Sequence, residues 1–227
     1  MCGRFTLAVT DQAFIKYIGD QFEISITNQK LGLPRYNISP GQEVLSMISD
    51  GARYRVGPLH WGFVPPFAKE VSTGYTMINA KSETLEEKVS YLPSFEKKRC
   101  VIFADSFYEW KRNESQKQPY RIQKKNQEIF ALAGLYTTFT KSDGTKYHST
   151  VIITTEANPL MKDLHDRMPV ILDHDKIKIW LDPTIHDTKL LKQYLIPYDD
   201  TFMEYYPVSN FVNSSLHESA ECIKKME

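Results

Sequence analysis

The stretch Glu-Val-Leu-Ser-Met-Ile-Ser-Asp-Gly-Ala-Arg-Tyr-Arg-Val-Gly-Pro-Leu, residues 43–59, predicts the fold of this chain most directly. Two apolar-rich segments, 43–49 and 53–59, flank the dipeptide Asp50-Gly51. Asp-Gly between two such segments is a strong β-hairpin signal, because glycine accepts the positive φ of a tight hairpin turn. We therefore expect antiparallel strands joined by short turns.

The same pattern recurs along the rest of the chain. Asp143-Gly144 is a second hairpin signal, and the apolar segment 99–109 predicts a strand that runs into Trp110. Further strands are expected at 120–123, 128–139, 146–155 and 202–209, and helices at 11–19, 82–89, 158–165, 175–181 and 188–195. Because strands outnumber helices, we predict an α+β fold with mainly antiparallel sheet, a partly closed β-barrel-like core and peripheral helices.

Composition narrows the class of protein. The chain has 227 residues, 41% of them hydrophobic and 25% charged, which is ordinary for a globular protein, and no linker interrupts it. We expect a single domain over 1–227, with no secretory segment or membrane span, in the cytoplasm. Its 28 basic residues balance 28 acidic ones, although basic residues exceed acidic ones between Lys81 and Lys125. The 3 cysteines and 6 histidines form no disulfide framework and no metal-ligand spacing, so we expect no metal and no cofactor.

Cys2 follows Met1, and removal of Met1 leaves it with a free α-amine and a thiol on adjacent carbons. Such an aminothiol reacts twice with an aldehyde: the amine forms an imine, and the thiol adds to it and closes a five-membered thiazolidine ring. Ordinary pKa values of about 8 for the amine and about 8.5 for the thiol leave some of each nucleophilic at neutral pH. The position of Cys2 alone does not distinguish a residue with this reactivity from an unreactive small residue near a chain end.

Four other polar residues stand out, and each also has a purely structural explanation. Asn37 precedes a turn and Asn79 precedes an expected helix, where caps are common. Glu109 ends an apolar strand, where burial raises a carboxyl pKa toward that of a general acid or base, unless it pairs with a neighbouring cation. His165 titrates near neutral pH, or is a loop histidine bonded to backbone. None of the four assigns a function by itself.

Eight motifs in order along the chain connect these residues. They are Met-Cys-Gly-Arg-Phe (1–5), Tyr-Asn-Ile-Ser-Pro-Gly-Gln (36–42), Trp-Gly-Phe-Val-Pro (61–65), Asn-Ala-Lys-Ser-Glu-Thr (79–84), Phe-Tyr-Glu-Trp (107–110), Thr-Thr-Glu-Ala-Asn (154–158), His-Asp-Arg-Met-Pro (165–169) and Val-Ser-Asn-Phe-Val-Asn (208–213). Together they resemble the SOS-response-associated peptidase (SRAP) family, also called abasic-site processing proteins. One such motif is weak support, whereas eight in this order are specific.

The resemblance implies the SRAP fold and a DNA-damage function. Proteins of this family bind abasic sites in single-stranded DNA and form a covalent DNA–protein crosslink through the N-terminal cysteine. By motif match, the catalytic residues are Cys2, Asn79, Glu109 and His165. The resemblance further places Arg4, Trp61, Lys81 and Arg167 along the DNA strand, and Asn37 and Pro40 in a loop near the lesion. Lys81 departs from the family's usual arginine, which keeps the charge but loses the bidentate contact to phosphate.

These roles lead to a mechanistic hypothesis. A partly protonated Glu109 donates to the ring oxygen of the abasic sugar and then helps water leave, while His165 relays protons. Asn79 holds the Cys2 amine or a phosphate by hydrogen bonds, and Trp61 stacks on a flanking base. The imine stage permits strand cleavage, a lyase side reaction, and the family name implies self-removal of Met1. We expect a monomer without membrane contact, nucleoid-associated when it acts on DNA.

Other functions compete with this hypothesis. The Met-Cys-Gly start also resembles N-terminal-nucleophile amidases, in which Cys2 attacks an amide, and Cys2 with His165 and Glu109 would suit a cysteine peptidase. A third alternative is a non-catalytic reader of modified bases. It predicts unchanged binding after Cys2→Ala and no covalent adduct.

Overall fold

The computed structural model describes residues 2–27, 30–72, 77–112 and 117–227. Its first sheet contains β11 (Arg167–Pro169), β10 (Lys146–Glu156), β4 (Tyr54–Trp61), β3 (Glu43–Ser49), β6 (Arg99–Ala104), β9 (Phe130–Thr140), β12 (Ile171–Leu172) and β5 (Asn79–Lys81). Pairing of β10 with β9 closes five of these strands, β10, β4, β3, β6 and β9, into a barrel. Most pairs are antiparallel, but β10 runs parallel to β4 and β5. The predicted barrel-like core is therefore confirmed, and its ring of strands is closed.

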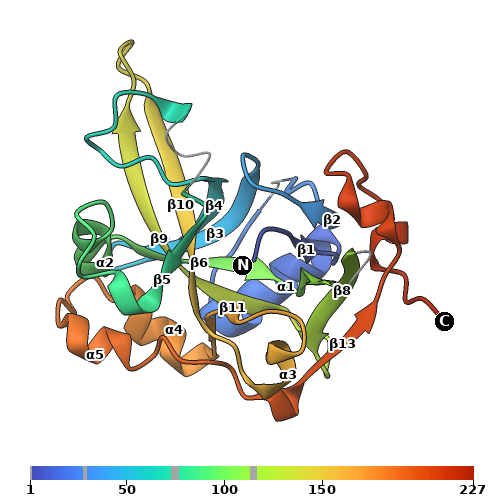
Figure 1. Cartoon of the computed structure of the whole chain (residues 1–227). Coiled ribbons are helices and arrows are strands. Elements are labelled where there is room, and N and C mark those ends of the chain that lie inside the picture. Colours follow the sequence, from blue (N-terminus) through green and yellow to red (C-terminus); the bar gives the residue numbers. More distant parts are fainter. Residues whose placement is uncertain (1, 28–29, 73–76, 113–116) are drawn as a thin grey trace.

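The second sheet lies beside the barrel. Its strands, in spatial order, are β13 (Met203–Pro207), β8 (Lys117–Lys124), β7 (Ser106–Arg112), β1 (Phe5–Leu7) and β2 (Arg35–Ile38). Figure 1 shows β9, β10 and β4 toward one side of the molecule, β8 and β13 toward the other, and β1 between them. The first strand of the chain thus lies inside the second sheet, between β7 and β2.

Both hairpins predicted from Asp-Gly dipeptides are confirmed. Strands β3 and β4 pair from Glu43↔His60 to Ser49↔Tyr54 across the first turn, and β9 and β10 pair across the second. Gly51 and Gly144 have φ values of +91° and +83°, a conformation that costs glycine little and other residues much. The turn residues therefore set the register of four of the five barrel strands.

The apolar segment 99–109 forms two strands, so the prediction of a single strand is wrong. The chain leaves the barrel at the end of β6 and enters the second sheet with β7, with Asp105 between them. Asp105 accepts from the Thr6 hydroxyl and pairs with Arg121 at 3.2 Å, and its own N–H donates to Thr6 O at 3.0 Å. Both strands are apolar because both are buried, and hydrophobicity alone does not reveal where a buried chain changes sheets.

The helices lie at the periphery (Figure 1). They are α1 (Asp11–Phe22), α2 (Leu92–Lys97), α3 (Pro159–Lys162), α4 (His174–Leu181) and α5 (Thr188–Lys192). The expected helix at 82–89 is wrong: only Ser82–Thr84 forms a single 3-10 turn, η2. Glu83 there pairs with Arg167, and Glu86 pairs with Lys192. We attribute the difference to these tertiary contacts, which override weak helix propensity. The sequence also missed α2.

Gly134 in β9 is a point where the barrel tolerates no side chain. A Cβ built there would lie 2.9 Å from Val151 O, 3.0 Å from Cys100 Sγ and 3.0 Å from Ile102 Cδ1. We expect Gly134→Ala to lower the free energy of unfolding by about 1–3 kcal/mol, the usual cost of overpacking a dense core. Urea denaturation measures this value. Gly57→Ala is the matched control, because a Cβ there meets nothing within 4 Å; equal effects of the two substitutions would contradict the packing argument.

Within the described ranges, no helix is both long and apolar enough to cross a membrane.

Candidate active site

Strand β1 holds the chain that follows Cys2. It pairs with β2 on one edge and with β7 on the other. The Tyr108 N–H donates to Arg4 O at 2.9 Å, and the rings of Phe5 and Trp61 pack with their centroids 5.1 Å apart. Because β1 is paired on both edges and buried on its apolar face, the position of Cys2 is fixed by the fold.

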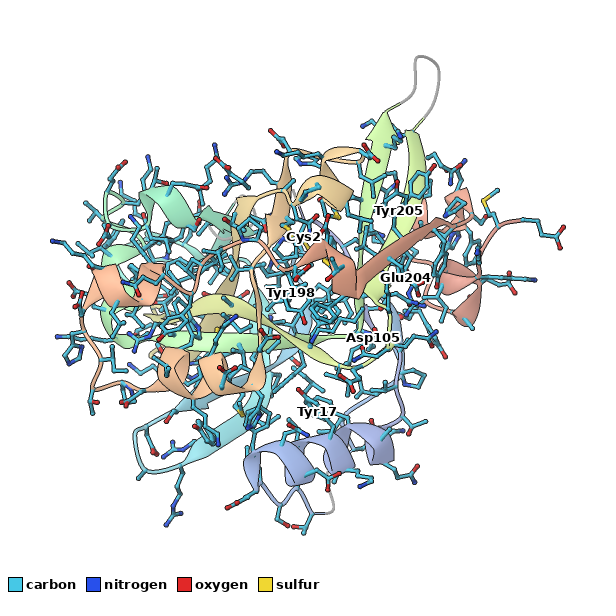
Figure 2. All side chains as sticks on the ribbon, turned by 90° about the horizontal axis from the view of Figure 1, so that it is seen from below. Cys2, Tyr17, Asp105, Tyr198, Glu204 and Tyr205 are labelled. Carbon is cyan, nitrogen blue, oxygen red and sulfur yellow. The ribbon has the colours of Figure 1, made fainter. Side chains whose placement is uncertain are left out.

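The Cys2 thiol is buried beside a carboxylate. Cys2 is fully buried, in the interior of the molecule (Figure 2). Burial first, and then the negative charge of Glu109, raise the pKa of the Cys2 thiol far above its ordinary value. The thiol is therefore protonated at neutral pH in this environment. Protonation of Glu109, or a positive charge beside the thiol, acts in the opposite direction.

Asn79 makes a direct contact with Cys2. Asn79 is the first residue of β5, where it pairs with Ile152 of β10. Its Nδ2 donates to Cys2 O at 2.8 Å. Its Oδ1 is buried and has no hydrogen-bond partner in the part of the chain that the structure describes. An acceptor of this kind, next to the Cys2 main chain, is suited to receive an N–H or O–H group.

A pocket of about 490 Å³ brings several predicted site residues together. It is lined by Gly3, Arg4, Glu109, Trp110, Lys117, His165 and Asn213. Glu109 projects from β7 and is only 4% exposed, and this burial raises the pKa of its carboxyl, against the opposing charge of His165. Glu109 therefore stays protonated to a higher pH than an ordinary glutamate, as a general acid requires.

His165 lies in the turn before β11, where its ring faces two alternative partners. Its Nδ1 is 3.0 Å from the Arg167 N–H and 2.7 Å from Asp166 Oδ1. One nitrogen cannot serve both at once, because it accepts from Arg167 when unprotonated and donates to Asp166 when protonated. Nδ1 therefore has a partner whether or not it carries a hydrogen, which suits a group that relays protons.

Arg4 and Asn37 form an internal clamp. Arg4 Nη1 donates to Asn37 Oδ1 at 2.6 Å and to Val212 O at 2.9 Å. Asn37 Nδ2 in turn donates to the main-chain oxygens of Ser214 (2.9 Å) and His217 (2.7 Å). Asn37 is fully buried in β2, not in a loop as expected. Its side chain therefore holds the 212–217 segment against the site and has no free surface for DNA.

The clamp predicts a large stability effect. We expect Asn37→Ala to lower the free energy of unfolding by about 2–4 kcal/mol, because it leaves buried backbone oxygens and the Arg4 guanidinium without their partner. Chemical denaturation followed by circular dichroism measures the loss. Asn126→Ala is the matched control, since Asn126 is exposed. A loss no larger than the control's would refute the clamp.

Trp61 and Pro40 occupy different environments. Trp61 is fully buried, and its Nε1 donates to Ile78 O at 2.9 Å. The expectation that Trp61 stacks on a DNA base does not fit this geometry, because no face of the ring is open. Pro40 lies half-buried in the turn between β2 and β3, beside Gly41, whose N–H donates to Trp61 O at 2.8 Å.

Lys81 and Arg167 lie at neighbouring strand ends. Both β5 and β11 pair with β10, where Lys81 is opposite Thr154 and Arg167 is opposite Glu156. Lys81 is exposed, whereas the Arg167 side chain is only 12% exposed and is bound to Glu83. These two cations thus lie near the same end of β10, but they are not equally accessible.

Four residues that line the pocket were not predicted from the sequence: Gly3, which lies in the first motif, and Trp110, Lys117 and Asn213. Trp110 Nε1 donates to Asn213 Oδ1 at 2.7 Å, and the Arg4 guanidinium lies over the Trp110 ring at 5.8 Å. Trp110 and Asn213 each end one of the eight motifs, so a signal for them was present. Lys117 has no such signal.

Among the described side chains, no group of 3 or more His, Cys, Asp or Glu residues is arranged to hold a metal ion.

Comparison with known proteins gives consistent matches over the whole chain. The sequence profile of the family "SOS response associated peptidase (SRAP)" matches residues 1–215. The chain is 48% identical to the abasic site processing protein YoaM of Bacillus subtilis, over 98% of this chain and 97% of YoaM. It is 27% identical to the abasic site processing protein YedK of Escherichia coli, over 99% of both chains. A crystal structure of a Bacteroides thetaiotaomicron protein has the same fold, with a TM-score of 0.85 at 23% identity over 100% of both chains.

Proposed function

The chain belongs to the SOS response associated peptidase (SRAP) family, and from this premise we propose that it captures abasic sites in single-stranded DNA through a covalent bond to Cys2. The observation that carries the proposal is that residues from separate parts of the chain meet at one pocket. Gly3, which directly follows Cys2, lines this pocket together with Glu109 and His165. The names of YoaM and YedK, as abasic site processing proteins, support the substrate class.

The reaction begins once Met1 is removed, and we propose that the chain removes it itself. The freed Cys2 amine attacks the aldehyde carbon of the open abasic sugar, and the carbinolamine loses one water to give an imine. The Cys2 thiol then loses its proton as its sulfur attacks the imine carbon, and the imine nitrogen takes up one proton, so the ring closes with no net change in protons. One C–N and one C–S bond form, one water leaves, and no cofactor is consumed.

Three side chains have distinct roles in this sequence. Glu109, whose carboxyl pKa is raised by burial, donates a proton to the sugar ring oxygen, regains one from the hydroxyl that becomes the aldehyde, and then donates to the departing hydroxyl. His165 exchanges protons with the sugar hydroxyl, and its Nδ1 has a partner both with and without a hydrogen. Asn79 offers its buried Oδ1 to the Cys2 amine. The imine stage allows β-elimination, so we propose a slow lyase reaction beside the crosslink.

DNA contacts are assigned more narrowly than the motifs alone suggest. We propose that Lys81 and Arg167 bind phosphates and that Arg4 and Asn37 shape the pocket from within. Trp61 has no part in stacking, because it is buried. We further propose that the whole chain acts as one domain and as a monomer, and that it is nucleoid-associated when it acts on DNA.

The test is covalent capture on denaturing gels. Protein confirmed to lack Met1 is incubated with a single-stranded oligonucleotide that carries one abasic site, with the same strand undamaged, and with the abasic aldehyde blocked by methoxyamine. We expect a crosslinked band only with the free aldehyde, and a weaker band when the lesion lies in a duplex. No adduct with the free aldehyde, together with turnover of an amide substrate, would replace the proposal by an N-terminal-nucleophile hydrolase.

A further inference from the structure

The Glu83 carboxylate binds the guanidinium of Arg167. Arg167 Nη1 donates to Glu83 Oε1 at 2.7 Å, and Nη2 donates to Glu83 Oε2 at 2.9 Å, which makes a bidentate pair. Arg167 Nη2 also donates to Thr154 O at 2.7 Å. Arg167 Nε is buried and has no hydrogen-bond partner within the described residues. Each nitrogen of the Arg167 guanidinium is thus either hydrogen-bonded or buried.

A phosphate takes the bidentate position at Arg167 only by replacing this carboxylate. Carboxylate and phosphate each present two oxygens to the same guanidinium fork, so they compete for one geometry. The Glu83 side chain is 44% exposed, whereas Arg167 is 12% exposed. Glu83 therefore has solvent to turn into, while Arg167 stays where β11 and Thr154 hold it.

The pair also removes charge from the surface. The hydrogen bond from Arg167 lowers the pKa of Glu83 below its ordinary value, so at neutral pH the carboxylate is ionised and cancels the guanidinium charge. Lys81, two residues before Glu83, is exposed and forms no salt bridge with another described residue. Of the two cations near this end of β10, only Lys81 is both exposed and free of a carboxylate partner among the described residues, so only its charge is open to an approaching DNA strand.

We propose that Glu83 is a built-in competitor of the DNA phosphate at Arg167, and that it keeps affinity for undamaged single strands low, so that stable capture depends on reaction with the lesion. This inference rests on the proposed function for its ligand, single-stranded DNA. It assigns Glu83 as a specificity-determining residue, because a phosphate contact that is weak without the lesion favours the damaged strand over the far more abundant intact DNA.

The first experiment measures binding to undamaged DNA. Fluorescence anisotropy with a labelled oligothymidine strand compares the wild type, Glu83→Gln and the matched control Glu87→Gln. Glu87 is exposed in the same segment, so its substitution changes net charge equally. We expect Glu83→Gln to bind about 10-fold more tightly at low salt, as one charged phosphate contact allows. Its salt slope becomes steeper by about 0.7, and Glu87→Gln changes affinity less than about 2-fold.

A second comparison attributes the gain to Arg167. In an Arg167→Gln background, Glu83→Gln gains no affinity, because no guanidinium is released. Equal or weaker binding by a folded Glu83→Gln variant would overturn the inference, since Glu83 would then support Arg167 instead of competing for it. A gain that persists without Arg167 would overturn it as well, because the effect would be one of general charge.

The same samples separate this inference from the proposed function. Adduct yield on an abasic strand tests the function, whereas anisotropy on the intact strand tests Glu83. Wild-type adducts with no affinity gain in Glu83→Gln refute the inference and leave the function standing. An Arg167-dependent gain without any adduct supports competition at Arg167 and refutes covalent capture. If the function and the inference both hold, Glu83→Gln binds intact DNA more tightly, and its ratio of abasic-strand binding to intact-strand binding is lower than that of the wild type.

Discussion

A Cys2→Ser variant lacking Met1 forms no adduct that survives without reduction, while it still forms an imine that borohydride traps. Serine keeps the α-amine but replaces the thiol by a hydroxyl, a much weaker nucleophile toward the imine carbon. We expect the yield of borohydride-independent adduct to fall by at least about two orders of magnitude. Denaturing gels with and without borohydride measure both products on the same abasic strand.

Matched thiol controls make this result specific. Cys222→Ala removes a buried thiol that does not line the pocket, and its adduct yield stays at the wild-type level. Cys2→Ala, like Cys2→Ser, loses the stable adduct and keeps the trapped imine. A stable adduct with either Cys2 variant would mean that another residue, such as a lysine, carries the bond.

Replacing Glu109 by glutamine slows adduct formation by about 10²–10⁴-fold, the usual contribution of a positioned general acid or base. Glutamine has nearly the same shape but donates no proton to the sugar oxygen or to the departing water. The wild-type rate falls as pH rises through the raised pKa of Glu109, and the variant loses this dependence. Single-turnover rates across pH measure both effects. Glu43→Gln is the control, because Glu43 is exposed and outside the pocket.

The same Glu109→Gln substitution that slows the reaction is expected to stabilise the folded protein at neutral pH. Because the folded-state pKa of Glu109 is raised, the folded protein binds this proton more tightly than the unfolded chain does. That stabilisation is fully present below the unfolded pKa of about 4.3 and is lost as pH rises through the folded pKa. We therefore expect Glu109→Gln to unfold at a higher temperature than the wild type at neutral pH, and the advantage to disappear below about pH 4. A variant that is both slower and less stable at neutral pH would contradict the assigned burial cost.

The fold was predictable where short-range signals specify geometry. Asp-Gly at 50–51 and 143–144 predicted two hairpins, and both form with positive φ at glycine. The change of sheets at Asp105 was not predictable, because apolar residues are required on both sides of it. The failed helix at 82–89 has the same kind of cause: its acidic residues pair with Arg167 and Lys192, more than 80 residues away.

The site was predictable as a set of residues but not as a set of contacts. The motifs pointed to Glu109 and His165, which line one pocket, and to Asn79, which touches Cys2. Their catalytic roles stay predictions. Motifs could not separate residues that face the pocket from those that support it, because that depends on pairing across long sequence distances. Arg4 reaches Asn37, 33 residues away, and Val212, 208 residues away, while Trp61 is turned into the core.

The most direct test of the central claim is intact-protein mass spectrometry after reaction with a single-stranded oligonucleotide that carries one abasic site, without any reductant. A thiazolidine at Cys2 requires that the adduct mass equal protein lacking Met1 plus oligonucleotide minus one water, and that fragmentation place the bond at the terminal residue. An adduct that retains Met1, or one whose fragments place the DNA on a lysine, would contradict covalent capture through the Cys2 aminothiol.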